Sequence, residues 1–89
     1  MTIEKLRDFS KSDVQEFEDL IVQLEGTGKD AASFAEECHT WFYKGEISPK
    51  EKVRLTNWCK PSTDPRKLGR EIAQKISTLV FGKIITELD

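Results

Sequence analysis

The 89 residues carry 14 basic and 16 acidic side chains, a net charge of −2, and 37% of them are hydrophobic. This size predicts a single domain over residues 1–89 with room for only a modest core. No apolar run approaches the roughly 18 residues that a membrane span needs, and the charged N-terminus has no signal-peptide core. We therefore expect a cytoplasmic protein with reduced cysteines and no membrane contact.

Apolar residues at every third position from Ile3 to Phe9 suggest a short leading turn or helix. Ser10 and Asp13 have the spacing of a capping box, which predicts the start of the first secure helix. Gly26 is expected to end that helix. Its apolar face would consist of Val14, Phe17, Leu20, Ile21 and Leu24.

A second helix is expected from a cap at Asp30 to a stop at Gly45. Of its aromatic cluster at 41–43, we expect the first two residues to pack in the core and Tyr43 to be partly exposed. The alternative is a stacking platform for bases or a hot spot for a protein partner. Ser48-Pro49-Lys50-Glu51 is a capping box with proline at the first helical position, and it predicts a third helix that ends before Pro61.

The last predicted helix runs from Asp64 to Leu88, with Pro65 at its first position. Its second half is apolar on several sides, although Gly82 lies inside it. Two interpretations remain open: a central helix surrounded by its neighbours, or a tail that docks on a second chain. A β-strand over residues 78–86 is a further alternative, because β-branched residues are dense there.

These elements predict an all-α fold, a compact bundle of four, possibly five, helices in which the C-terminal helix is the longest. Their connections are short, which favours antiparallel or angled neighbours.

The sequence offers few residues for catalysis or metal binding. Cys38, His39 and Cys59 are the only soft metal ligands, whereas a structural zinc site normally uses four. Adjacent helical residues point about 100° apart, so Cys38 and His39 cannot both face one ion. No acid–base pair can be placed across a cleft. We expect no enzymatic activity, no cofactor, no metal and no small-molecule substrate.

Charge is unevenly distributed along the chain. Residues 1–40 carry a net charge of −6 and residues 41–89 a net charge of +4. Like charges at i,i+4 and cations at a helix N-terminus are mildly unfavourable unless something negative lies nearby. That group could be the acidic half of the same chain, a protein partner or phosphates. The candidate contact residues are Lys50, Arg54, Arg66, Lys67 and Arg70.

These features favour a small protein-binding module, such as a regulator, inhibitor, adaptor or small subunit. It would bind another protein, or itself, through its basic face and an apolar C-terminal surface. The alternative is sequence-independent nucleic-acid binding, although the low isoelectric point of about 5.4 argues against it. A helix-turn-helix fits poorly, because bulky Trp41 stands where that motif usually has alanine. The candidate apolar contacts are Phe81, Ile84, Ile85 and Leu88.

Overall fold

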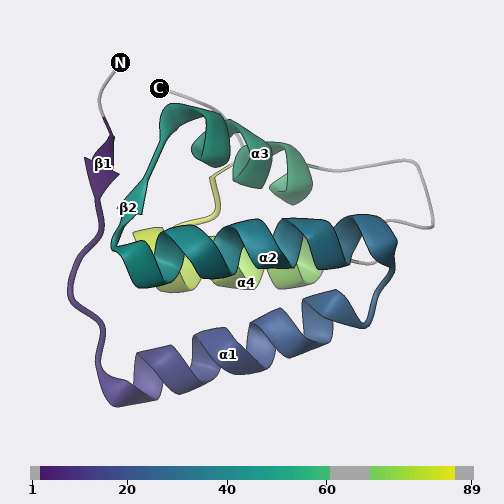
Figure 1. The fold of residues 1–89 in the computed structure, drawn as a ribbon, viewed down its shortest axis with the longest axis horizontal. Helices are drawn as coiled ribbons and strands as arrows, with labels where there is room; N and C mark the ends of the chain where they lie inside the picture. The colour runs from purple at the N-terminus through teal and green to yellow at the C-terminus, as the bar shows by residue number, and fades with distance from the viewer. Residues whose placement is uncertain (1–2, 61–68, 86–89) are drawn as a thin grey trace.

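Four α-helices account for most of the computed structural model, which describes residues 3–60 and 69–85 (Figure 1). The radius of gyration is 12.2 Å, close to the roughly 12 Å expected for a compact chain of this length. The prediction of a compact, mostly helical protein is confirmed. In chain order the elements are β1 (Glu4–Lys5), α1 (Lys11–Glu25), α2 (Lys29–Lys44), β2 (Glu46–Ile47), α3 (Pro49–Cys59) and α4 (Arg70–Phe81).

Helices α1 and α3 lie on opposite sides of α2 in Figure 1, with α4 behind α2. Helix α4 contacts both α1 and α3, and α1 also contacts α2. The core therefore lies between α4 and the three other helices. Among the residues that the structure describes, no helix has both the length and the apolar character needed to cross a bilayer.

Two helix starts follow the predicted capping boxes. The Ser10 hydroxyl accepts a hydrogen bond from the Asp13 amide at 3.1 Å, and the Asp13 carboxylate accepts one from the Ser10 amide. Ser48 and Glu51 repeat this arrangement at α3. The prediction that Asp30 caps α2 is wrong. Gly28, at φ 146°, lets the chain enter α2 directly, so Asp30 lies in the first turn.

The expected leading turn or helix is also wrong, because residues 4–5 form a strand that pairs antiparallel with β2. Gly45 ends α2 in the left-handed conformation, at φ 81°, and turns the chain into extended residues that offer a pairing edge. The Leu6 amide donates to the Gly45 carbonyl at 2.9 Å. No fifth helix is present in residues 3–60 or 69–85.

The C-terminal helix is shorter than predicted. Helix α4 ends at Phe81 because Gly82 is left-handed, at φ 76°. The buried Ser77 hydroxyl then donates to the Lys83 carbonyl at 2.8 Å and accepts from the Ile85 amide at 3.0 Å. A continuous helix to residue 88 is therefore wrong, and so is a strand over residues 78–85. The proposed start at Asp64, and residue 86, lie outside the described residues.

Among the described helices, α2 is the longest, with 16 residues, whereas α4 has 12. The expectation that the C-terminal helix is the longest is therefore not met over residues 3–60 and 69–85. The physical reason is the left-handed Gly82, whose amide donates to the Thr78 carbonyl and closes the last turn of α4.

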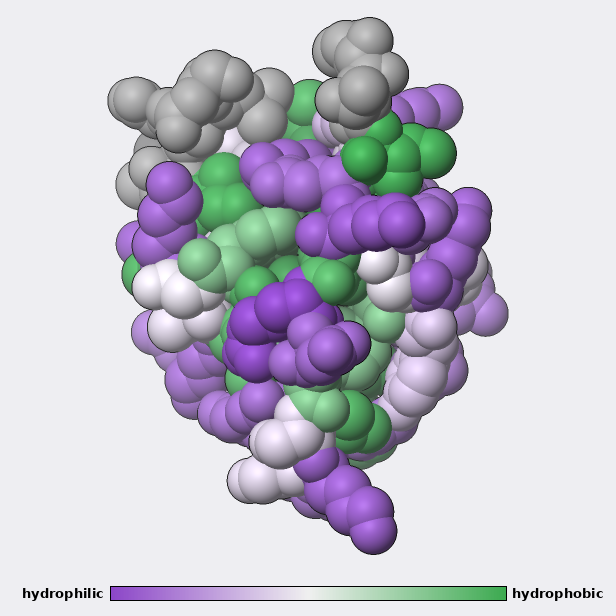
Figure 2. All heavy atoms as spheres, turned by 90° about the vertical axis from the view of Figure 1, so that its left-hand side faces the viewer, coloured by the Kyte–Doolittle hydropathy of each residue, from purple (hydrophilic) through white to green (hydrophobic). Residues whose placement is uncertain are grey.

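Aromatic pairs connect the helices in the core. Phe17 of α1 stacks on Phe42 of α2, with ring centroids 3.7 Å apart, and Phe34 of α2 stacks on Trp58 of α3 at 4.9 Å. Trp41 and Phe42 are buried and Tyr43 is exposed, as predicted. Figure 2, which faces the side carrying β1, shows apolar atoms between mainly hydrophilic side chains.

Candidate functional site

Helix α3 presents a basic surface to solvent. Its capping box fixes the start of the helix, and Leu55 and Cys59 bury the opposite side in the core. The exposed side contains three cations, one amide and Val53, which is 37% exposed, and none of its own residues is a carboxylate. We call this surface the basic face of α3. It consists of Lys50, Val53, Arg54 and Asn57 of the helix, together with Lys60, the extended residue that follows its last turn.

The cations of α3 differ in their partners. Arg54 forms an ion pair with Glu37 of α2. Lys52 lies beside this face, forms an ion pair with Glu4 at 2.8 Å and lies over the ring of Phe81. The interpretation that basic residues meet the acidic half of the same chain therefore holds for these two. Lys50 and Lys60 have no ion pair within residues 3–60 and 69–85.

The structure brings together two of the five predicted anion contacts. Lys50 and Arg54 share the basic face of α3. Arg70 begins α4 and is half-buried; its Nε atom is buried and has no hydrogen-bond partner in the described chain. Arg66 and Lys67 lie outside the described residues.

The predicted apolar C-terminal surface is not exposed as a unit. Ile84 is 46% exposed, but Ile85 is 5% exposed and Phe81 packs against the core. Leu88 lies outside the described residues. Ile84 instead borders an open groove of about 600 Å³ between α1 and α4. The groove is lined by Arg7, Glu16, Glu71, Gln74, Lys75, Thr78, Leu79 and Ile84.

Helix α1 presents an acidic surface that the sequence reading missed. Val22 is 65% exposed, the most exposed large apolar side chain among those described, and polar residues surround it at helical spacing. The sequence carried one signal for this exposure. At 100° per residue, Val22 falls outside the apolar stripe of the first helix that ends at Leu24. We call this surface the acidic face of α1. It consists of Gln15, Glu18, Asp19, Val22 and Glu25.

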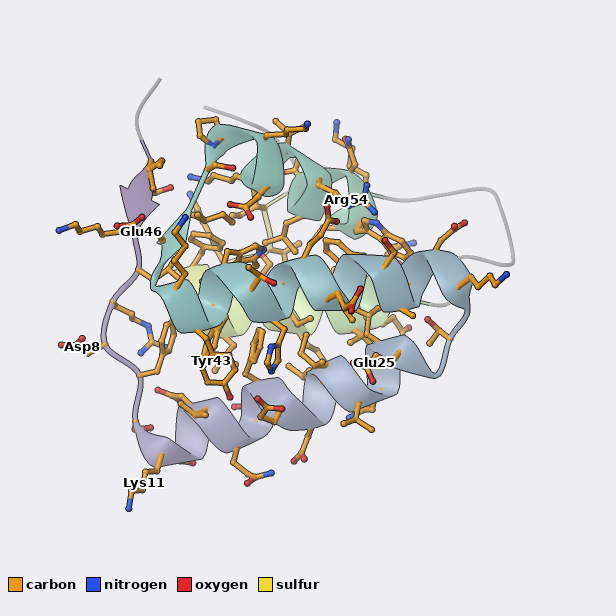
Figure 3. All side chains as sticks on the ribbon, in the orientation of Figure 1. Asp8, Lys11, Glu25, Tyr43, Glu46 and Arg54 are labelled. Atoms are coloured by element: carbon orange, nitrogen blue, oxygen red, sulfur yellow. The ribbon has the colours of Figure 1, made fainter. Side chains whose placement is uncertain are left out.

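Glu18 also joins α1 to α2. Its Oε1 atom accepts a hydrogen bond from the Tyr43 hydroxyl and lies 3.2 Å from His39 Nε2. Figure 3 shows Tyr43 directed toward α1. Donation of the phenolic proton to Glu18 raises the pKa of Tyr43 above its ordinary value. This exposed cluster fixes the position of Glu18 at the edge of the acidic face of α1.

The two thiols are poor nucleophiles in this fold. Cys38 and Cys59 are free and buried. Burial raises the pKa of the Cys38 thiol far above its ordinary value and that of the Cys59 thiol to about 11. Both side chains lie in the hydrophobic core. In the described part of the chain, no three His, Cys, Asp or Glu side chains are grouped so that they could hold a metal ion.

Within the described residues the geometry thus offers two charged helix faces and the open groove beside Ile84. A second open groove, of about 540 Å³, lies between α1 and α2 and is lined by Glu25, Ser33, Glu36, Glu37, His39 and Thr40. Comparison with protein-family models, curated proteins and solved structures found no match for this chain.

Proposed function

We propose that this protein is a small, non-enzymatic protein-binding module whose contact surface is the basic face of α3. The observation that carries the proposal is the exposed Val53, which lies among three cations with no carboxylate on the same face. The groove beside Ile84 is a second candidate contact.

The mixture of side chains on this face favours a protein partner over phosphates. Protein interfaces combine an apolar centre with a polar rim, and complementary charges at the rim raise the association rate. Val53 would supply the centre, and Lys50 and Lys60 the rim. A nucleic-acid surface would need more free cations, because affinity for the phosphate backbone grows with each phosphate neutralised. Arg54 is already paired with Glu37.

The test is copurification from the native host with a charge-reversed variant and a matched control. Lys50→Glu/Lys60→Glu reverses two lysines of the basic face, whereas Lys11→Glu/Lys83→Glu reverses two exposed lysines elsewhere. Both variants have the same net charge, so any difference between them reports the position of the charge. We expect the first variant to lose a partner protein that the control retains.

Identical partners for both variants would contradict this placement of the contact surface. Circular dichroism verifies that each variant is folded, and all four lysines are exposed, so no loss of structure is expected.

A gel-shift experiment addresses the alternative function. Duplex DNA and single-stranded RNA are each titrated with the protein in about 50 mM salt, where nonspecific binding is strong. Binding that Lys50→Glu/Lys60→Glu abolishes would replace the proposal with nucleic-acid binding. No shift would exclude the alternative.

The C-terminal contact is tested separately with Ile84→Asp. Ile84 is exposed, so this change should leave stability nearly unaltered. Loss of a partner would identify the groove beside Ile84 as a contact, and full retention would exclude it.

A further inference from the structure

We infer that the basic face of α3 docks on the acidic face of α1 of a second copy of this chain. The inference rests on the proposed function, because it assigns a partner to the same face of α3. It depends on the agreement of two surfaces in charge, composition and spacing.

The two faces have matching composition. Each contains one exposed valine, one amide side chain and three charged side chains of a single sign. Between residues 15 and 25 the acidic face of α1 contains no cation, although Lys11 lies on the same stripe one turn before Gln15. The basic face of α3 has no carboxylate of its own, although Glu37 of α2 lies against Arg54. No like charges meet between these two sets of residues, and like-charge contacts are what normally disfavour wrong partners. The charge of Glu37, which borders the basic face, is offset by its ion pair with Arg54.

The spacing of the residues also matches. If the two helices pack antiparallel with Val22 opposite Val53, one pair of opposite charges and one carboxylate–amide pair come together. Glu25 follows Val22 by three residues and Lys50 precedes Val53 by three, so these two come together. Glu18 precedes Val22 by four residues and meets Asn57, which follows Val53 by four. With a rise of about 1.5 Å per residue, these pairs lie about one helical turn on either side of the valines.

Contacts within each copy hold one side chain of each face in place. Glu18 is fixed by Tyr43 and lies beside His39, and Arg54 is fixed by Glu37. Side chains that are already ordered lose less conformational entropy on association. Lys50, which has no ion pair in residues 3–60 and 69–85, remains available for the Glu25 carboxylate of the second copy, and Lys60 lies opposite Gln15.

One molecule cannot form this contact with itself. Helices α1 and α3 flank α2 from opposite sides, as Glu25 and Arg54 illustrate in Figure 3. The contact therefore joins the α3 side of one copy to the α1 side of the next. Such a head-to-tail interface gives a ring or an open chain rather than a two-fold dimer. A single helix face is small, so the association is expected to be weak and reversible.

Sedimentation velocity of the purified protein tests the inference. In about 50 mM salt the mean mass should rise with protein concentration, and it should return toward that of the monomer in about 1 M salt, where the Debye length falls to roughly 3 Å. Lys50→Glu/Lys60→Glu should raise the dissociation constant at least about tenfold. Asp19→Lys/Glu25→Lys should do the same, and mixing the two variants should restore association.

Cross-linking then separates docking in this register from general charge attraction. Val22→Cys and Val53→Cys proteins are mixed and oxidised with copper-phenanthroline; Cys38 and Cys59 are buried and should not compete. A disulfide-linked pair should form faster than when Ser12→Cys, exposed on α1 ten residues from Val22, replaces Val22→Cys.

A wild-type protein that stays monomeric at about 1 mM in low salt would overturn the inference, because weak interfaces still associate at that concentration. Equal cross-linking by the two cysteine positions would also overturn it. Neither result affects the proposed function, whose test is the copurification of a different protein. Conversely, self-association without any copurified partner would support this inference and contradict the proposal of a separate protein partner.

Discussion

Gly69 is the position at which a single methyl group should disturb this fold most clearly. It precedes α4 in an ordinary right-handed conformation, at φ −77° and ψ −6°, so alanine causes no backbone strain there. However, an added Cβ would lie 2.9 Å from Leu24 Cδ1 and 2.9 Å from Trp58 Cζ3. Leu24 is fully buried, and Trp58 is stacked on Phe34, so neither can move without disturbing the core.

Two opposing effects set the magnitude for Gly69→Ala. Alanine restricts the unfolded chain, which stabilises by about 0.4–1 kcal/mol at a compatible backbone position. Overpacking a core costs about 1–3 kcal/mol. We therefore expect a net loss of about 1–2 kcal/mol in the free energy of unfolding. For a domain of this size that corresponds to a fall in Tm of roughly 4–16 °C.

Gly26 provides a matched control with nearly the same backbone conformation, φ −76° and ψ −7°. The nearest atom to its added Cβ would be the Gln23 carbonyl oxygen at 3.5 Å, an ordinary contact. Gly26→Ala should therefore be neutral or slightly stabilising. Thermal unfolding followed by circular dichroism, with urea unfolding at 25 °C, compares the two variants with the wild type.

The reasoning is refuted if Gly69→Ala is as stable as Gly26→Ala. A second variant locates the cause. Trp58→Leu removes the ring that the new methyl group meets, so it should reduce the additional cost of Gly69→Ala in a double-mutant cycle. An unchanged cost would mean that the loss does not arise from this contact.

Three further predictions concern the buried hydroxyl, the cluster at Glu18 and the thiols. Ser77→Ala should lower the free energy of unfolding by about 1–3 kcal/mol in urea unfolding, because the Lys83 carbonyl and Ile85 amide lose their partner; a change near zero would contradict this role. The pKa of Tyr43 is raised in the folded protein, so the stability that its hydrogen bond supplies is present below the unfolded value near 10 and is lost as pH rises through the folded value. Ultraviolet titration of this sole tyrosine should show the raised pKa, and Glu18→Gln should lower it; equal titration curves would contradict the assignment. Both cysteines should react with a thiol reagent only after unfolding, because burial keeps them protonated and inaccessible; rapid reaction of the native protein would refute this.

Local signals in the sequence predicted the helix starts well. The capping boxes at Ser10 and Ser48 involve residues three apart, so their geometry depends little on the rest of the molecule. Gly45 and Gly26 likewise end helices as predicted. These elements need no knowledge of tertiary contacts.

The errors arose where distant residues decide the conformation. Gly82 lies among apolar residues that favour a longer helix, but the Ser77 hydroxyl holds the chain beyond it in another direction. The strand at Glu4–Lys5 exists because β2, more than 40 residues away, offers an edge. Neither interaction has a recognisable sequence pattern.

The candidate site was predicted only in part. Helical spacing placed Lys50 and Arg54 on one surface, but it could not show that Glu37 pairs with Arg54. Val22 and Val53 were overlooked because an isolated apolar residue carries weight only once its exposure is known. The opposite charges of the basic face of α3 and the acidic face of α1 become apparent only when the two helices are placed in space.

The N-terminal segment has a consequence for the order of folding. Arg7 donates a hydrogen bond of 2.7 Å to the Leu79 carbonyl, 72 positions along the chain, and its guanidinium lies over the Phe9 ring. We expect contacts of such long sequence separation to form late, after α1 and α2 have met through their short connection. Interactions absent from the transition state act mainly on the unfolding rate. Loss of the Arg7 side chain should therefore shorten the lifetime of the native state while leaving the refolding rate almost unchanged.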